Sequence, residues 1–149
     1  MKNNIELPSL ELFHNRVPLQ LRFNDVDVLG HVNNTVYFSF YDTGKAYYFT
    51  AVRGERMDWK HVDTVIANVN CAYLAPIFFT DKVEVMTTTL SISEKSFRLL
   101  QMIREVNTGE VKSVCETVMV CFDPKTGKSV AVSNEMREKL IRFEGRDLF

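Results

Sequence analysis

The sequence lacks the features that mark membrane, secreted and metal-binding chains. It has three cysteines in 149 residues, an odd number without CxxC spacing, and three histidines without ligand-like spacing. No window approaches the ~18 apolar residues of a membrane span, and the first residues lack the apolar segment of a signal peptide. We therefore expect a cytoplasmic protein with free thiols, no metal site and no membrane partner.

An excess of charge of one sign is also missing. The formal net charge is -1, with 25% charged and 46% hydrophobic residues. Proteins that bind nucleic acid usually carry a basic face, so we expect no nucleic-acid partner. The length and ordinary composition predict one domain over residues 1–149, with a core over about 17–132 and a C-terminal helix over about 133–145.

Hydrophobic periodicity predicts a strand over 18–23 and a long helix over 34–49. Apolar residues cover most of the circumference of this helix, so we expect it to be buried on nearly every side. Gly44 lies in its middle, where glycine costs about 1 kcal/mol relative to alanine. This glycine therefore predicts close backbone packing at the centre of the helix.

Four more strands are predicted, over 64–74, 82–92, 97–106 and 110–122. The inward phase changes along the second of them, which predicts a β-bulge within Thr87–Thr89. Ser133 or Asn134 can cap the C-terminal helix. The order of elements predicts an α+β fold, in which an antiparallel five-stranded sheet curls around one long central helix.

The polar stretch from Asn24 to Asn34 combines two aspartates, a histidine and asparagines at the start of the predicted helix. A helix N-terminus offers unpaired N–H groups and a positive dipole end, which suit an anion or a developing oxyanion. A carboxylate nearby could attack a polarised carbonyl or activate water. By itself, Asp27 fits this chemistry or a purely structural role in the loop.

The run Asp25-Val26-Asp27-Val28-Leu29-Gly30-His31-Val32-Asn33-Asn34, with Tyr37 one helical turn later, resembles the signature of the 4-hydroxybenzoyl-CoA thioesterase-like family of hotdog proteins. The later Tyr73-Leu74-Ala75-Pro76 and Asp81-Lys82-Val83-Glu84-Val85 resemble that family's second and third strands. The resemblance extends from about Leu19 to Phe122. It implies a hotdog fold, hydrolysis of acyl-CoA thioesters, and an active site between the subunits of a homodimer.

The resemblance also implies roles for individual residues. Asp27 matches the catalytic carboxylate, and Asn34 matches the residue whose backbone N–H polarises the thioester carbonyl. Lys95 and Arg98 fall where the family meets the phosphates of coenzyme A, which belongs to the substrate, so no separate cofactor is implied. Relatives often have an acidic pair followed by Ala-Arg where this chain has Asp42-Thr43-Gly44-Lys45, which leaves the role of Asp42 open.

The other residues of the motif have simpler interpretations. Asp25 is expected to hold the loop that presents Asp27. Asn33 is expected to cap the helix beside the substrate. Tyr37 either lines the acyl pocket or belongs to the core, and His31 either positions water or packs within the loop.

Three functions remain in competition. The leading hypothesis is hydrolysis of an acyl-CoA or acyl-carrier-protein thioester, with Asp27 as nucleophile or general base. An enoyl-CoA hydratase-like enzyme would use Asp27 and His31 as an acid/base pair, although the run from Gly30 to Asn34 matches thioesterases better. A non-catalytic acyl-CoA-binding module is the third.

The strand from Val65 to Tyr73 is long and unprotected, which predicts pairing into a homodimer or homotetramer. The acyl group and the choice between these two assemblies stay open.

Overall fold

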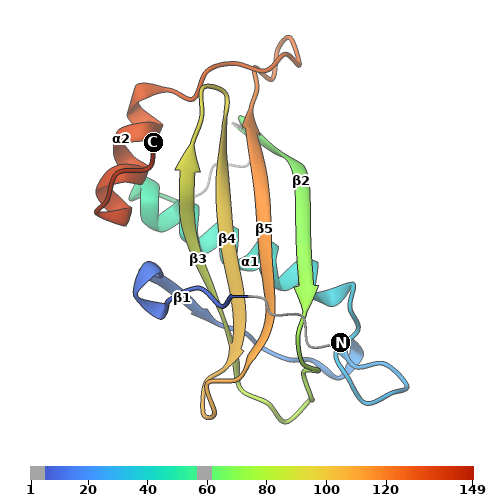
Figure 1. The fold of residues 1–149 in the computed structure, drawn as a ribbon. Coiled ribbons are helices and arrows are strands. Elements are labelled where there is room, and N and C mark those ends of the chain that lie inside the picture. Colours follow the sequence, from blue (N-terminus) through green and yellow to red (C-terminus); the bar gives the residue numbers. More distant parts are fainter. Residues whose placement is uncertain (1–5, 57–61) are drawn as a thin grey trace.

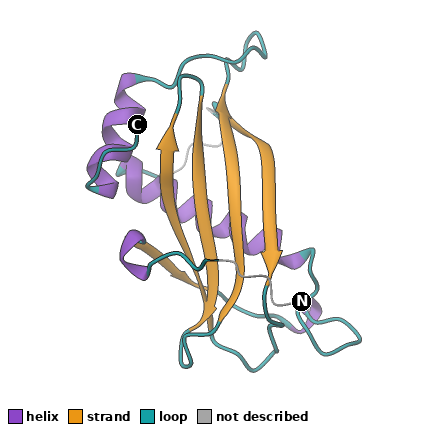
Figure 2. Cartoon of the chain, viewed as in Figure 1, coloured by secondary structure: helices purple, strands orange, loops and turns teal. Residues whose placement is uncertain are grey.

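The computed structural model describes residues 6–56 and 62–149. Five strands form one antiparallel sheet in the order β1-β3-β4-β5-β2, and the long helix α1 crosses one face of it (Figures 1 and 2). The elements in chain order are the 3₁₀ turn Leu10–Leu12, β1 Asn15–Pro18, the 3₁₀ turn Phe23–Asp25, α1 Val36–Arg53, β2 Thr64–Tyr73, β3 Val83–Ile92, β4 Ser96–Glu105, β5 Val111–Cys121 and α2 Asn134–Glu144. The predicted α+β hotdog arrangement is confirmed.

The helix α1 is buried on one side only. Gly44 faces the sheet, where an added Cβ would lie 2.9 Å from both Gln101 Nε2 and a Val85 methyl, so the predicted close packing is confirmed. The expectation that nearly every side is buried is wrong, because Phe38 and Tyr47 are 42% and 59% exposed on the side that the sheet does not cover. The residues of α1 that are buried are Tyr37, Phe40, Tyr41, Gly44, Lys45, Tyr48, Phe49 and Val52.

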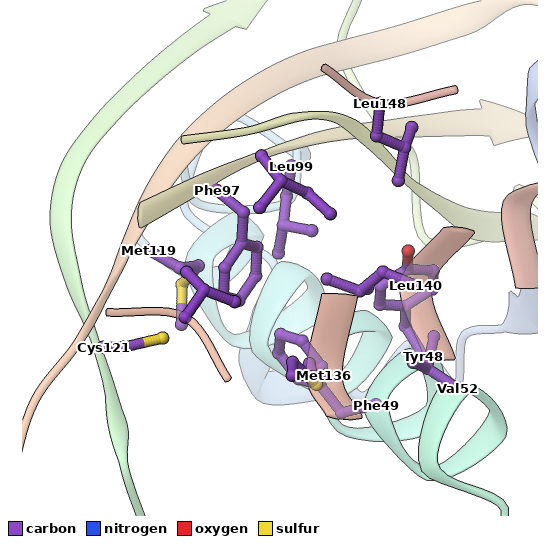
Figure 3. Close-up of a cluster of buried hydrophobic side chains, with 12 residues drawn as sticks. Tyr48, Phe49, Val52, Phe97, Leu99, Met119, Cys121, Met136, Leu140 and Leu148 are labelled. Atoms are coloured by element: carbon purple, nitrogen blue, oxygen red, sulfur yellow. The ribbon is translucent and has the colours of Figure 1, made fainter. Parts of the chain in front are cut away.

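The C-terminal helix α2 closes one end of the core. Ser133 is its N-cap, with its side chain accepting a hydrogen bond from Met136 N at 3.1 Å, as predicted. Met136 and Leu140 pack against the second half of α1 and against β4 and β5 (Figure 3). This end of the core also contains the buried Glu144 carboxylate, which accepts hydrogen bonds from the side chains of Tyr48, Thr88 and Arg146.

The N-terminal segment runs over the opposite face of the sheet (Figure 1). Phe13 is buried there against Met86, Leu100 and Met102. Both faces of the central strands are therefore covered, as the near-continuous burial along β3 and β4 shows. Within the described residues, no helix is long and apolar enough to cross a membrane.

The first strand lies earlier in the chain than predicted. It covers Asn15–Pro18 instead of 18–23, and only Leu19 N continues the pairing, donating to Val83 O at 2.9 Å. Asp25 Oδ2 accepts the Arg22 N–H at 2.8 Å and closes the 3₁₀ turn Phe23–Asp25, which takes the following residues out of the strand. This local side-chain hydrogen bond outweighs the alternating pattern.

Two smaller predictions about boundaries are also corrected. The predicted helix 34–49 is observed over Val36–Arg53, ending at Gly54 in the left-handed conformation with φ 71°. The bulge in β3 lies between Thr89 and Ser91 and not within Thr87–Thr89, because these threonines stay in register with β4.

Candidate active site

The loop between β1 and α1 is a small hairpin that presents Asp27. Val26 pairs with Val32, and Asp27 N donates to His31 O at 2.9 Å. Gly30 has φ 79°, which glycine adopts without strain, and its N–H donates to Asp27 O at 3.0 Å. Asp27 Oδ1 accepts the Leu29 N–H at 2.9 Å, which fixes the carboxylate at the base of the hairpin while it stays half-buried.

Asp25 lies beneath this hairpin. Its side chain is 2% exposed and accepts hydrogen bonds from the backbone N–H and the guanidinium of Arg22 at 2.8 and 3.3 Å. Its carbonyl accepts the Asn33 N–H at 2.8 Å. Asp25 therefore joins the two ends of the loop, and its carboxylate is occupied.

The N–H groups in the turn that leads into α1 differ in their partners. Asn33 accepts the Thr35 N–H on Oδ1 at 3.0 Å and the Val36 N–H on its carbonyl at 2.9 Å. Asn33 thus closes the turn that leads into α1. The prediction that it is the N-cap of the helix is wrong, because α1 begins at Val36 and its N-cap is Thr35. Across residues 6–56 and 62–149, the Asn34 N–H has no hydrogen-bond partner. That N–H remains available to a ligand.

A pocket lies beside the Asp27 hairpin, and the segment that follows β2 forms its opposite wall. Val32 N donates to Ile77 O at 2.8 Å, and the rings of His31 and Phe78 meet edge to face with centroids 5.2 Å apart. Lys112, with a side chain 4% exposed, donates to Pro76 O at 2.9 Å. These contacts attach the wall to the Asp27 hairpin and to β5.

Two tyrosines, Tyr37 and Tyr73, line the inner end of this pocket. The rings of Tyr37 and Tyr73 meet edge to face at 4.9 Å, and the Tyr73 hydroxyl donates to Asn34 O at 3.1 Å. Burial raises the pKa of Tyr37 to about 12, and burial also raises the pKa of Tyr73. Both hydroxyls are therefore neutral near pH 7 and can only donate or accept hydrogen bonds.

Together these pieces enclose a pocket of about 330 Å³. It is lined by Asp27, His31, Val32, Asn34, Tyr37, Tyr73, Leu74, Ala75 and Pro76. Asp27 and Asn34, whose N–H has no partner among the described residues, thus line one cavity near the start of a long helix. This combination can bind a carbonyl group, polarise it and deliver a nucleophile or a base to it.

The structure brings together four residues proposed from the sequence, namely Asp27, His31, Asn34 and Tyr37. The wall from Tyr73 to Pro76 had been noted in the sequence only as part of a strand. Its residues lie about forty positions from the motif and reach it only through the sheet. No local signal in the sequence predicted that contact.

Lys95 and Arg98 lie at the far end of the sheet from this pocket. Ile103 pairs with Ser113 beside the pocket, whereas Arg98 pairs with Val118, about 16 Å away along the strand. Arg98 forms an ion pair with Glu116. Neither cation reaches the pocket of its own chain.

Asp42 does not line the pocket either. Its side chain is 67% exposed and lies 3.4 Å from Lys45 Nζ. As to metals, the described part of the chain holds no group of three His, Cys, Asp or Glu side chains able to bind an ion. His61 lies outside the described residues.

Comparison with known proteins gives consistent matches. The sequence profile of the Thioesterase-like superfamily matches residues 21–140. The long-chain acyl-CoA thioesterase FadM of Escherichia coli is 29% identical over 82% of this chain and 93% of its own length. The uncharacterized protein YsmA of Bacillus subtilis is 27% identical, over 87% of this chain and 85% of its own. The crystal structure of a thioesterase from Thermus thermophilus, complexed with coenzyme A and zinc, superimposes with a TM-score of 0.83 at 31% identity, covering 93% of this chain and all of that one.

Proposed function

This chain belongs to the Thioesterase-like superfamily, as a thioester hydrolase of the hotdog fold, and we propose that Asp27 is its catalytic carboxylate toward acyl-CoA. One observation carries the proposal. Asp27, which is half-buried, and Asn34, whose N–H has no partner in the described part of the chain, line the same pocket. Hydrolysis of a thioester needs both groups, one to attack or activate water and one to stabilise the oxyanion.

The thioester carbonyl oxygen accepts a hydrogen bond from Asn34 N–H at the positive end of α1. Asp27 then acts in one of two ways. It attacks the carbonyl carbon, expels the thiolate of coenzyme A and forms an anhydride that water hydrolyses, or it removes a proton from an attacking water. A single turnover in oxygen-18 water separates the two routes, because only the anhydride route can leave the label in the Asp27 side chain.

Supporting residues hold these two groups in place. Asp25 and Asn33 join the two ends of the loop, and the Tyr73 hydroxyl restrains Asn34 through the Asn34 carbonyl. The imidazole of His31 packs against Phe78 in the pocket wall. This contact supports the packing role for His31, and the carboxylate mechanism does not require an imidazole.

We further propose that two chains pair through β2 to complete the site. β2 is an edge strand, with Val65 and Ile66 46% and 45% exposed. A twofold axis would pair two such edges antiparallel, so the Tyr73 end of one strand meets the Thr64 end of the other. In each chain, Cys121 pairs with Thr64, and the Cys121 N–H donates to Lys95 O. Lys95 and Arg98 therefore lie near the Thr64 end of β2. Coenzyme A bound in one pocket would therefore extend toward Lys95 and Arg98 of the partner subunit.

The acyl group is proposed to be a fatty acyl chain carried by coenzyme A. Support comes from FadM, which is named for its action on long-chain acyl-CoA. Acyl-carrier-protein thioesters are a second class of substrate with the same reacting group.

The test is a panel of acetyl-, hexanoyl-, palmitoyl- and benzoyl-CoA, with released coenzyme A measured by a thiol reagent. We expect release from the longer aliphatic substrates, and loss of release in Asp27→Asn. Binding of acyl-CoA without release of coenzyme A would contradict the proposal in favour of a binding module. Hydration of crotonyl-CoA in the same preparation would favour a hydratase.

A further inference from the structure

Two cysteines lie directly opposite each other on neighbouring strands, Cys71 on β2 and Cys115 on β5. Leu74 N donates to Lys112 O at 2.9 Å, so these two residues form a hydrogen-bonded pair at the end of the same ladder. Hydrogen-bonded and non-hydrogen-bonded pairs alternate, which makes Cys71 and Cys115 a non-hydrogen-bonded pair. Cα atoms of such pairs lie about 4.5 Å apart, within the range of about 4.4–6.8 Å that a disulfide requires.

The surroundings of the two thiols differ. Both are free, but Cys115 is 1% exposed in the core beside Tyr41, whereas Cys71 is half-buried on the edge strand. The neighbouring Cys115 thiol lowers the pKa of Cys71 to about 6, with Ser113 Oγ 3.4 Å from Cys71 Sγ as a further partner. The neighbouring Cys71 thiol and burial raise the pKa of Cys115. Cys71 is therefore the nucleophile of the pair, because the thiolate is the reactive form.

This pair is adjacent to the candidate active site. Tyr73 follows Cys71 by two residues, so both side chains lie on the same face of β2. The Tyr73 hydroxyl donates to Asn34 O at 3.1 Å, and burial and the nearby Cys71 thiol raise the pKa of Tyr73. A change at Cys71 can therefore reach Asn34 through one intervening side chain.

We propose that Cys71 and Cys115 form a modification site at which a peroxide converts the two thiols to a disulfide. The Cys71 thiolate attacks one oxygen of hydrogen peroxide, the O–O bond breaks, and with one proton the products are a sulfenic acid and water. Cys115 Sγ then attacks the sulfenic sulfur, the S–O bond breaks, and hydroxide leaves with the Cys115 proton as a second water. The two thiols lose two electrons and the peroxide gains them.

Formation of the disulfide removes the free thiol of Cys71, two residues from Tyr73 on the same face of β2. The inner wall of the pocket changes as a result, and turnover is expected to fall. This consequence for turnover rests on the proposed function, whereas formation of the disulfide does not.

The disulfide is tested by treating the native protein with hydrogen peroxide, alkylating the remaining thiols and mapping peptides without reductant. We expect a link between Cys71 and Cys115 within one chain, removed by dithiothreitol. The link should be absent in Cys71→Ser and Cys115→Ser and present in Cys121→Ser, a matched control for the third free cysteine, which lies opposite Thr64. Cys71→Ser introduces a hydroxyl at a half-buried position with polar neighbours, so its fold should survive.

Thioester hydrolysis, measured on the same samples, should fall at least severalfold in the wild type and in Cys121→Ser, and should recover with dithiothreitol. Cys71→Ser should keep its rate through the treatment. The proposal is overturned if Cys71 stays reduced, is oxidised beyond the sulfenic acid, or links to Cys71 of a second chain. If the protein releases no coenzyme A, only the proposed function is contradicted. The presence or absence of the disulfide-linked peptide still tests the modification site.

Discussion

The N–H groups at the start of α1 differ in their partners, and this difference locates the proposed oxyanion donor. The Thr35 and Val36 N–H groups both donate to Asn33, and the Asn34 N–H donates to no residue that the structure describes. Asn34 is the second residue of the turn that the hydrogen bond from Val36 N to Asn33 O closes, two residues before α1 begins.

Asn34→Pro should remove this donor with little change to the fold. Proline is favoured at the second position of a turn, since its fixed φ fits there, and its missing N–H breaks no hydrogen bond to a described residue. We expect kcat to fall by about 10²–10³, the usual loss for one oxyanion donor. Asn34→Ala keeps the N–H and should retain most activity. Equal rates in two folded variants would show that this N–H is not catalytic.

The two aspartates of the loop should separate by their response to substitution. The buried Asp25 carboxylate accepts hydrogen bonds from Arg22 and so holds the loop. Asp25→Asn removes the charge from this carboxylate and weakens these bonds, which should lower the free energy of unfolding by about 1.5–3 kcal/mol. Its turnover should fall less than that of Asp27→Asn. Urea unfolding and steady-state kinetics on both variants measure this, and the reverse order would reassign the catalytic aspartate.

At the scale of single residues, the motif predicted much of the candidate site. Asp27, His31, Asn34 and Tyr37 all lie within one short stretch, and the start of a helix brings them together. The wall that begins at Tyr73 was not predicted, because it meets the motif only after the strands have paired. Contacts of that kind depend on sheet order, which local periodicity does not specify.

At the scale of elements, the segment 74–81 positions the pocket wall, and Lys112 holds that segment. Lys112 Nζ donates to Pro76 O at 2.9 Å and lies 3.3 Å from an Asp81 carboxylate oxygen, and it also pairs with Glu110. Its carbonyl accepts the N–H groups of Leu74 and Ala75. Burial lowers the pKa of Lys112, but the bonds to Glu110 and Asp81 outweigh it and raise that pKa overall.

Lys112→Met should therefore loosen the wall while preserving the aliphatic volume. We expect a loss of about 1–3 kcal/mol in the free energy of unfolding, since Pro76 O and the Asp81 carboxylate lose a donor. KM should rise more than kcat falls, because the wall shapes the pocket and Asp27 remains in place. Lys139→Met, at a surface ion pair with Glu135 on α2, serves as the control. It should leave the free energy of unfolding and KM unchanged. An unchanged KM in folded Lys112→Met would contradict the role given to this lysine.

The elements themselves show where sequence periodicity succeeds. The strands β2 to β5 follow the predicted ranges closely, because each has a long run of β-formers ended by a turn. β1 was displaced because the bond from Arg22 N to Asp25 closes a 3₁₀ turn that hydrophobicity does not register. The apolar α1 was expected to be buried all round, yet Phe38 and Tyr47 are exposed in a single chain.

At the scale of the whole molecule, the exposed side of α1 with Phe38 and Tyr47, together with the edge of β2, supports the predicted assembly of several chains. Val69 lies in the middle of β2 and is 37% exposed. Val69→Lys would place a charge where two edges are proposed to meet, a position at which lysine opposes strand pairing. We expect this variant to sediment as a monomer and to lose kcat/KM.

Val130→Lys provides the control for that experiment, because Val130 is 40% exposed but lies outside β2. It should leave sedimentation and activity unchanged. A wild-type chain that is monomeric at micromolar concentration and fully active would contradict a site shared between subunits.

Asp27 is proposed to be the catalytic carboxylate of thioester hydrolysis, and comparing the turnover and the substrate binding of Asp27→Asn with those of the wild type tests this role. The amide keeps the size of the side chain and an oxygen to accept the Leu29 N–H, so the hairpin should persist. We predict that kcat for acyl-CoA falls by about 10²–10⁴ while the Kd of acyl-CoA and the melting temperature stay near those of the wild type. A folded Asp27→Asn variant that releases coenzyme A at the wild-type rate would contradict the assignment.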